Sequence, residues 1–129
     1  MGLDMYLTSR SEFDRVKAND DYCDWAELAY WRKFNALHAW FVRNVQDDVD
    51  DCGAYVVSRT KLSELVEVLK KLQQTRDTSL LPTQSGFFFG STQYDEWYWN
   101  RVNSTIDILS EILATFDFEN EELLYTSSW

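Results

Sequence analysis

The first residues, MGLDMYLT (residues 1–8), decide the fold class of this chain. Leu3, Met5 and Leu7 alternate with Asp4 and Tyr6, which is the two-residue period of a strand with one buried face. The last residues, LLYTSSW (residues 123–129), also have an extended character. A strand at each end of the chain, with helical patterns between them, predicts an α+β domain whose two ends pair.

Three long helical patterns lie between these strands. Apolar residues recur at steps of three and four within residues 24–44, within 62–72 and from Thr92 to about Phe116. A helical turn over 13–16 and a brief strand over 54–58 are also expected. The prediction is therefore a single domain, residues 1–129, with about three main helices packed on a small antiparallel sheet that includes the N- and C-terminal strands.

The charge is strongly negative. The 129 residues carry 22 acidic and 12 basic side chains and one histidine, so the formal net charge is −10. Such a chain repels phosphates, so no direct binding of nucleic acid is expected. The sequence contains no apolar run long enough to span a membrane, and its start lacks the pattern of a secretory leader. We expect a cytoplasmic protein that contacts no membrane.

The acidic residues gather at several points, and two of these clusters are predicted to bind a partner. They lie between helical and strand patterns, where loops are expected, and carboxylates in ordered rows can stand in for phosphates on a basic protein surface. The alternative is that they serve only solubility and compensation of helix dipoles. The candidate partner-binding residues are Asp47, Asp48, Asp50, Asp51, Asp117, Glu119, Glu121 and Glu122.

A second hypothesis places a small-molecule pocket on the first long helix. Glu27, Trp31, Asn35 and His38 are spaced four, four and three residues apart, so one face of a continuous helix would present all of them. An imidazole beside a carboxylate can act as an acid–base pair near neutral pH. The alternative is a packed polar seam with His38 hydrogen-bonded inside it. Because His38 is the only histidine, no metal site is expected, and no cofactor.

The segment LLPTQSGFFFG (residues 80–90) is unusual, because two glycines bracket three phenylalanines after Pro82. Pro82 prevents a regular helix there. We expect either a short buried strand or a loop whose rings fill the core; in the pocket hypothesis this loop would be a lid.

Several blocks, in this order, carry a resemblance that spans nearly the whole chain. They are MGLDMYL (1–7), YWRKFNALHAWF (30–41), LPTQSGFFFG (81–90), YDEWY (94–98) and YTSSW (125–129). The chain resembles a family of small, uncharacterised bacteriophage and prophage proteins. The resemblance implies a phage or prophage setting and a bacterial cytoplasm, and it implies no catalytic residue.

The function predicted from these features is a phage-derived, non-enzymatic interaction protein. Its negative surface would bind or inhibit a bacterial protein with a basic surface, one that handles nucleic acid or serves defence, including by mimicry of nucleic acid. The alternative is a small enzyme or ligand-binding protein built on the pocket residues. The oligomeric state stays open.

Overall fold

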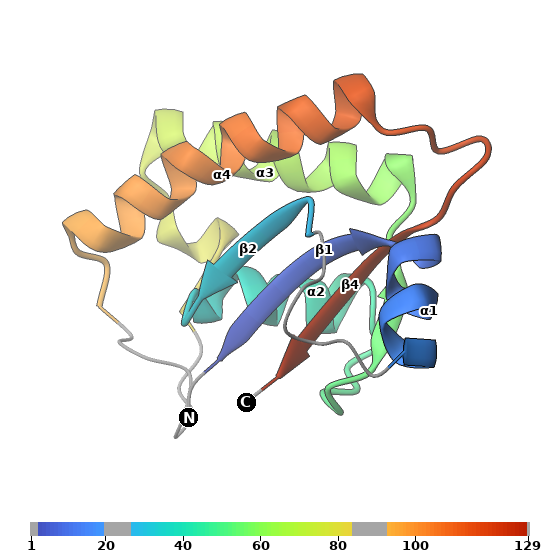
Figure 1. The fold of residues 1–129 in the computed structure, drawn as a ribbon. Coiled ribbons are helices and arrows are strands. Elements are labelled where there is room, and N and C mark those ends of the chain that lie inside the picture. Colours follow the sequence, from blue (N-terminus) through green and yellow to red (C-terminus); the bar gives the residue numbers. More distant parts are fainter. Residues whose placement is uncertain (1–2, 20–26, 84–92, 129) are drawn as a thin grey trace.

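The two ends of the chain pair in the centre of one sheet, as the sequence predicts. A computed structural model describes residues 3–19, 27–83 and 93–128. Strand β1 (Asp4–Ser9) lies antiparallel to β4 (Leu123–Ser128), with Asp4 opposite Ser128 and Ser9 opposite Leu123. Figure 1 shows the two strands side by side. The α+β fold, with both terminal strands in an antiparallel sheet, is confirmed.

Two shorter strands complete the sheet at its edges. Strand β2 (Ala29–Arg32) pairs with β1, and strand β3 (Ala54–Val56) pairs with β4. The order across the sheet is β2-β1-β4-β3, and every described pair is antiparallel. The brief strand expected over 54–58 is therefore present in shortened form.

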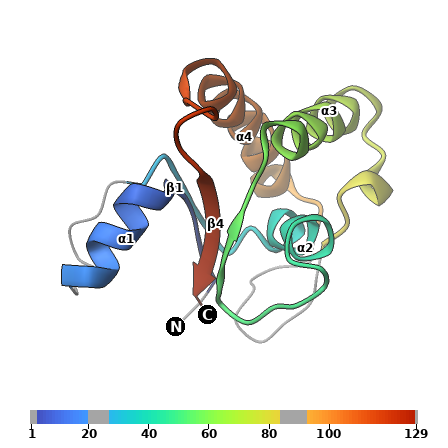
Figure 2. The same cartoon turned by 90° about the vertical axis from the view of Figure 1, so that its right-hand side faces the viewer.

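Three helices cover one face of the sheet and the first helix covers part of the other. Helices α2 (Asn35–Asn44), α3 (Arg59–Thr75) and α4 (Glu96–Thr115) enclose the core with the inward side chains of the strands. Helix α1 (Arg10–Asn19) lies on the opposite side of the sheet (Figure 2). Leu3, just before β1, and Met5 and Leu7 within it alternate in the sequence, and all three are fully buried.

Local signals set the ends of the two longest helices. Helix α3 begins after Ser58, whose hydroxyl accepts a hydrogen bond from the backbone N–H of Lys61, and its C-cap is Arg76 in a left-handed conformation. A single 3₁₀ turn, η1 (Thr78–Leu80), follows. Helix α4 begins after Asp95, which accepts from the N–H of Tyr98. Thr92, where the sequence suggested the start, lies outside the described residues.

The prediction of one helix over 24–44 is wrong within its described part, residues 27–44. Ala29 and Trp31 are buried while Tyr30 and Arg32 are exposed, so this part is the edge strand β2. Lys33 then has φ 56°, a left-handed conformation that turns the chain before α2 begins at Asn35. The aromatic residues of this segment fit a period of two as well as one of 3.6, and tertiary pairing with β1 selects the strand.

The predicted core strand or loop over 80–90 lies outside the described residues from residue 84 onward. Just before it, Leu81 is fully buried and its carbonyl accepts a hydrogen bond from the hydroxyl of buried Tyr98, at 2.7 Å. Among the described residues, no helix is both long enough and apolar enough to cross a membrane.

Candidate functional site

The connection between α2 and β3 carries the densest run of acids in the described chain. We call residues 46–53 the acidic loop; it holds four carboxylates in the five residues 47–51. The chain turns back sharply there, because Asp47, Asp48 and Cys52 have φ values of 50°, 64° and 59°. Asp tolerates this left-handed region better than most residues other than Gly. The N–H of Asp48 donates to the carbonyl of Val42 at 2.8 Å, which ties the turn to the last part of α2.

Asp50 differs from the other acids of the loop, because it points inward. Its Oδ1 lies 2.9 Å from Nε2 of His38, and Nδ1 of His38 lies 2.6 Å from the hydroxyl of Tyr125. His38 and Tyr125 are buried, with 1% and 0% of their surface exposed, whereas the Asp50 side chain keeps 27%. Three residues from α2, the acidic loop and β4 thus form one hydrogen-bonded chain, which we call the Asp50–His38–Tyr125 chain.

Burial determines the protonation state of the His38 imidazole and the Tyr125 phenol. Removal from water lowers the pKa of His38 below its usual value, although Asp50 acts in the opposite direction, so the imidazole is neutral at pH 7. Burial also raises the pKa of the Tyr125 phenol well above its ordinary value, and the charge of Asp50 adds to this effect. The phenol therefore keeps its proton and can donate it to a hydrogen bond.

Asp51 closes the end of the acidic loop. Its Oδ1 accepts from the N–H of Gly53 at 2.9 Å and from the hydroxyl of Tyr55 at 2.8 Å. The Tyr55 bond, followed by that of Gly53, lowers the pKa of Asp51. A side chain at position 53 would place its Cβ 2.8 Å from Asp51 Oδ1, so it would displace the Asp51 carboxylate. Cys52, a free thiol, is exposed.

In the second predicted acidic cluster, residues 117–122, three of the four carboxylates are already engaged in hydrogen bonds or ion pairs within the protein. Asp117 accepts from the backbone N–H groups of Glu119 and Asn120, which closes the turn after α4. Glu121 accepts from Ser11 at 2.7 Å, and Glu122 pairs with Arg10 at 3.2 Å, so both bind the start of α1. These pairs are exposed, so each contributes little to stability.

The topology places the two acidic clusters at opposite ends of the β3–β4 ladder. Ala54 lies opposite Thr126, and the N–H of Val57 bonds to the carbonyl of Leu123. The acidic loop therefore precedes the ladder at one end, and residues 117–122 precede it at the other (Figure 1). With a rise of about 3.4 Å per residue, the ladder alone separates the two ends by about 10 Å.

Both clusters also follow the C-terminus of a helix. Helix α2 ends at Asn44 and helix α4 ends at Thr115, so the acids come after the negative end of each helix dipole. Compensation of helix dipoles therefore does not explain the acidic loop. In the second cluster, by contrast, Glu121 accepts from the backbone N–H of Ser11 at 3.2 Å, which places a negative charge at the N-terminus of α1. Asp47, Asp48 and Glu119 are exposed, and in the part of the chain that the structure describes their side chains make no hydrogen bond or ion pair.

The four residues of the predicted pocket do not share one helix face. Glu27 is exposed before β2, Trp31 lies in β2, and Asn35 and His38 lie in α2. The indole N–H of Trp31 donates to Oγ1 of Thr105 in α4 at 2.9 Å, and both side chains are buried. Asn35 is 2% exposed. Three of the four residues thus lie in the interior, where two of them bond to residues that the spacing argument did not name.

The residues that sequence reasoning missed are Tyr125 and Thr105. Tyr125 lies 87 positions after His38, and Thr105 lies 74 positions after Trp31. The only available signal was the extended character of residues 123–129, which indicates a strand and not the partner of one side chain. Among residues 3–19, 27–83 and 93–128, no group of three potential metal ligands comes together.

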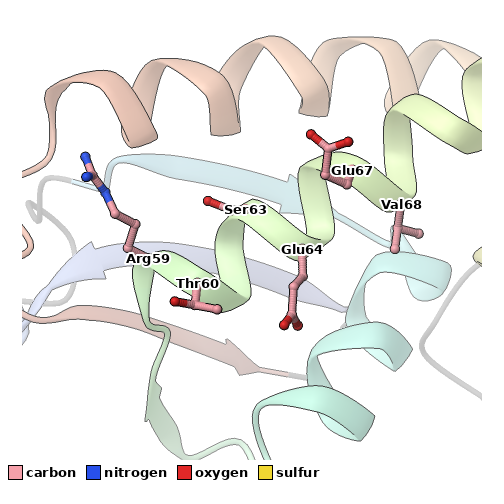
Figure 3. A pocket seen from close by; sticks show the side chains of 6 residues that line it. All are labelled: Arg59, Thr60, Ser63, Glu64, Glu67 and Val68. Carbon is pink, nitrogen blue, oxygen red and sulfur yellow. The ribbon is translucent and has the colours of Figure 1, made fainter.

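The structure also has a shallow depression of about 600 Å³ on the outer side of α3 (Figure 3). Its lining comes entirely from the first ten residues of that helix. The side chains that line it are Arg59, Thr60, Ser63, Glu64, Glu67 and Val68. Arg59 also donates to the carbonyl of Leu113 at 3.1 Å, so its guanidinium is engaged with the end of α4.

No family model, curated protein or solved structure matches the chain. The resemblance to bacteriophage and prophage proteins therefore stays a prediction from the quoted blocks. A functional proposal has to rest on the chemistry of the chain itself, and the acidic loop offers the most specific arrangement.

Proposed function

We propose that the chain is a non-enzymatic interaction protein whose acidic loop binds a basic surface on a bacterial protein. One observation carries the proposal: Asp47 and Asp48 are exposed and follow a helix C-terminus, and their carboxylates make no hydrogen bond or ion pair within the described residues. No Lys or Arg occurs between residues 44 and 58, so no cation of the same segment neutralises them. Charge placed in this way is available to a partner.

The shape of the acidic loop supports the same proposal. Asp50 holds one side of the loop through His38, and Asp51 holds the other through Tyr55 and Gly53. The two carboxylates between α2 and these anchors therefore sit on a defined turn. A preformed turn binds with a smaller loss of conformational entropy than a flexible one.

The resemblance to phage proteins supports a bacterial target, and the negative charge supports a target that handles nucleic acid or serves defence. A partner that contacted both the acidic loop and residues 117–122 would have to extend along the whole β3–β4 ladder. We therefore base the proposal on the acidic loop, with residues 117–122 as a second contact for a long partner. Mimicry of a nucleic-acid backbone would need such a partner.

The polar groups of the predicted ligand pocket are already bonded inside the protein, which favours the interaction function over a pocket. Both ring nitrogens of His38 already have partners, Tyr125 and Asp50, and Trp31 uses its indole N–H on Thr105. An acid–base role would require a substrate to displace one of these buried contacts.

The proposal is tested with the double variant Asp47→Asn and Asp48→Asn. Asn tolerates a left-handed backbone as well as Asp does, so the variant changes charge without changing the turn. The matched control is Asp107→Asn with Glu111→Gln, which removes two exposed charges from α4. The full chain captures its partner from a bacterial lysate at low salt, and the dissociation constant is then measured with the purified partner.

Loss of two exposed charge pairs of 0.2–1 kcal/mol each should weaken binding about 2- to 30-fold. The control should bind like the natural chain, and added salt should weaken the natural complex more than that of the double variant. Binding that does not depend on salt, or that the control weakens equally, would refute the proposal.

A further inference from the structure

The Asp50–His38–Tyr125 chain connects the acidic loop with the most deeply buried strand of the sheet. Its inner end is rigid, because the ring of Tyr125 stacks on Phe41 at 3.9 Å between centroids and is fully buried. Its outer end, Asp50, lies two residues after Asp48, one of the charges of the proposed interface. Whatever fixes Asp50 therefore also fixes how these charges are presented.

Within the Asp50–His38–Tyr125 chain, the residue on each side of the imidazole determines which ring nitrogen donates and which accepts. Neutral imidazole carries one N–H, and an ionised carboxylate only accepts, so the proton of His38 must be on Nε2, which faces Asp50. Nδ1 is then an acceptor, and the hydroxyl of Tyr125 donates to it. Exchange of the proton to Nδ1 would place two acceptors, Nε2 and Asp50 Oδ1, 2.9 Å apart. The buried phenol thus favours the tautomer that holds Asp50.

We propose that His38 and Tyr125 are positioning residues for the acidic loop: the phenol fixes the Nε2–H tautomer of the imidazole, and this tautomer holds Asp50. The inference rests on the proposed function for its consequence in binding, but the device itself acts in the free protein. Neither residue touches the partner, because both are buried.

The titratable groups around the imidazole agree with this assignment. Asp50 and the thiol of Cys52 come from the acidic loop, and the Tyr125 phenol comes from β4. Ser127, also on β4, is buried beside Tyr125, and its hydroxyl acts against the rise in the pKa of the phenol. No cation among these groups competes with the imidazole for Asp50.

The chain offers an unambiguous spectroscopic test, because His38 is its only histidine. In a ¹⁵N-labelled sample at pH 7.5, we expect Nε2 to give the signal of a protonated ring nitrogen and Nδ1 that of an unprotonated one. Tyr125→Phe removes the donor to Nδ1, so the two signals should shift toward an exchanging or protonated ring. A Nδ1–H tautomer in the natural chain would overturn the proposal.

The effect on the loop is tested by hydrogen exchange in Asp50→Asn and Asp50→Ala. Asn keeps an oxygen that accepts from Nε2–H, whereas Ala keeps none. We expect the backbone N–H groups of Asp48 and Val49 to exchange about tenfold faster or more in Asp50→Ala, because a hydrogen bond to a charged group is lost. Asp50→Asn should stay close to the natural chain, and amides of α3 serve as the internal control.

Unchanged exchange at Asp48 and Val49 in Asp50→Ala would also overturn the proposal. If that variant proves unfolded, the same measurement on Tyr125→Phe decides in its place. Partner binding is measured separately. If Asp50→Ala shows faster exchange but binds the partner as the natural chain does, the positioning role is confirmed and the acidic loop is refuted as the interface. A failure of the positioning proposal and a failure of the proposed function therefore give different results.

Discussion

The buried imidazole predicts that the protein loses stability in mildly acidic solution. His38 is neutral in the folded chain because burial lowers its pKa, whereas in the unfolded chain it titrates near its ordinary value of 6.5. A group whose folded pKa is depressed favours the folded state above the unfolded pKa. That contribution is lost as the pH falls from the unfolded pKa through the folded pKa.

The size of the effect follows from the protonation of the unfolded chain. At pH 5.5 an unfolded histidine of pKa 6.5 is mostly protonated, so the loss is at most about 1.4 kcal/mol if His38 stays neutral in the fold. Because His38 is the only histidine, no second imidazole contributes in this window. The carboxylates whose pKa is lowered by hydrogen bonds titrate at lower pH; they are Asp51, Asp77, Asp117 and Glu121.

The assay is urea unfolding at pH 7.5, 6.5 and 5.5, with the imidazole signals followed in parallel by NMR. We expect the free energy of unfolding to fall over this range and the His38 signals of the folded chain to titrate below 6.5. The variant His38→Gln serves as the control and should lose much less over the same range. Constant stability of the natural chain, or titration of folded His38 at or above 6.5, would refute the reasoning.

Three substitutions test the packing that positions the site. Thr105→Val should lower the free energy of unfolding by about 1–3 kcal/mol, because it leaves the buried indole N–H of Trp31 without a partner. Ser104→Ala, on the exposed side of α4, is the control and should change it little; urea unfolding measures both. Leu69→Ala should lower the free energy of unfolding by about 2–5 kcal/mol because this fully buried side chain fills the core. A smaller loss would mean that neighbouring side chains move in to fill the cavity. Asp95→Ala should cost about 0.5–2 kcal/mol through loss of the N-cap of α4, while Asp95→Asn should restore most of it; equal stability of the two variants would contradict the capping role.

The parts of the fold that the sequence predicts correctly are those with one clear period. Leu3, Met5 and Leu7 fit only a strand that is buried on one side, and Leu62, Leu65 and Leu69 fit only a helix. In each of these elements the side chains alone define the buried face. The two terminal strands, which are the longest of the described sheet, pair with each other over their whole length.

The error over 24–44 arises where the sequence has no local marker. The chain turns at Lys33 with φ 56°, but lysine gives no sign of a left-handed conformation, as glycine would. Tyr30 and Phe34 fit a helical stripe, yet Tyr30 points to the outer face of the sheet and bonds to Asp4 at 2.6 Å. Only the pairing with β1 distinguishes strand from helix, and single-sequence patterns do not contain that information.

The candidate site shows the same limit in its chemistry. The four acids between 47 and 51 look alike in the sequence, but the structure gives them different roles: Asp50 holds His38, Asp51 holds Tyr55, and Asp47 and Asp48 face solvent. These differences depend on partners whose distance along the chain is unrelated to their distance in space.

The two outward-facing acids lead to a last prediction, in which stability and binding change in opposite directions. In the free protein, Asp47→Asn with Asp48→Asn removes two neighbouring negative charges after the C-terminus of α2 and keeps residues that tolerate a left-handed backbone. The double variant should therefore be more stable by about 0.3–1 kcal/mol at low salt, measured by urea unfolding. If it is less stable, the carboxylates have an internal role and the argument for an interface fails. If it is more stable while its complex with the partner weakens, then carboxylates at these positions carry a cost to the fold that only binding compensates.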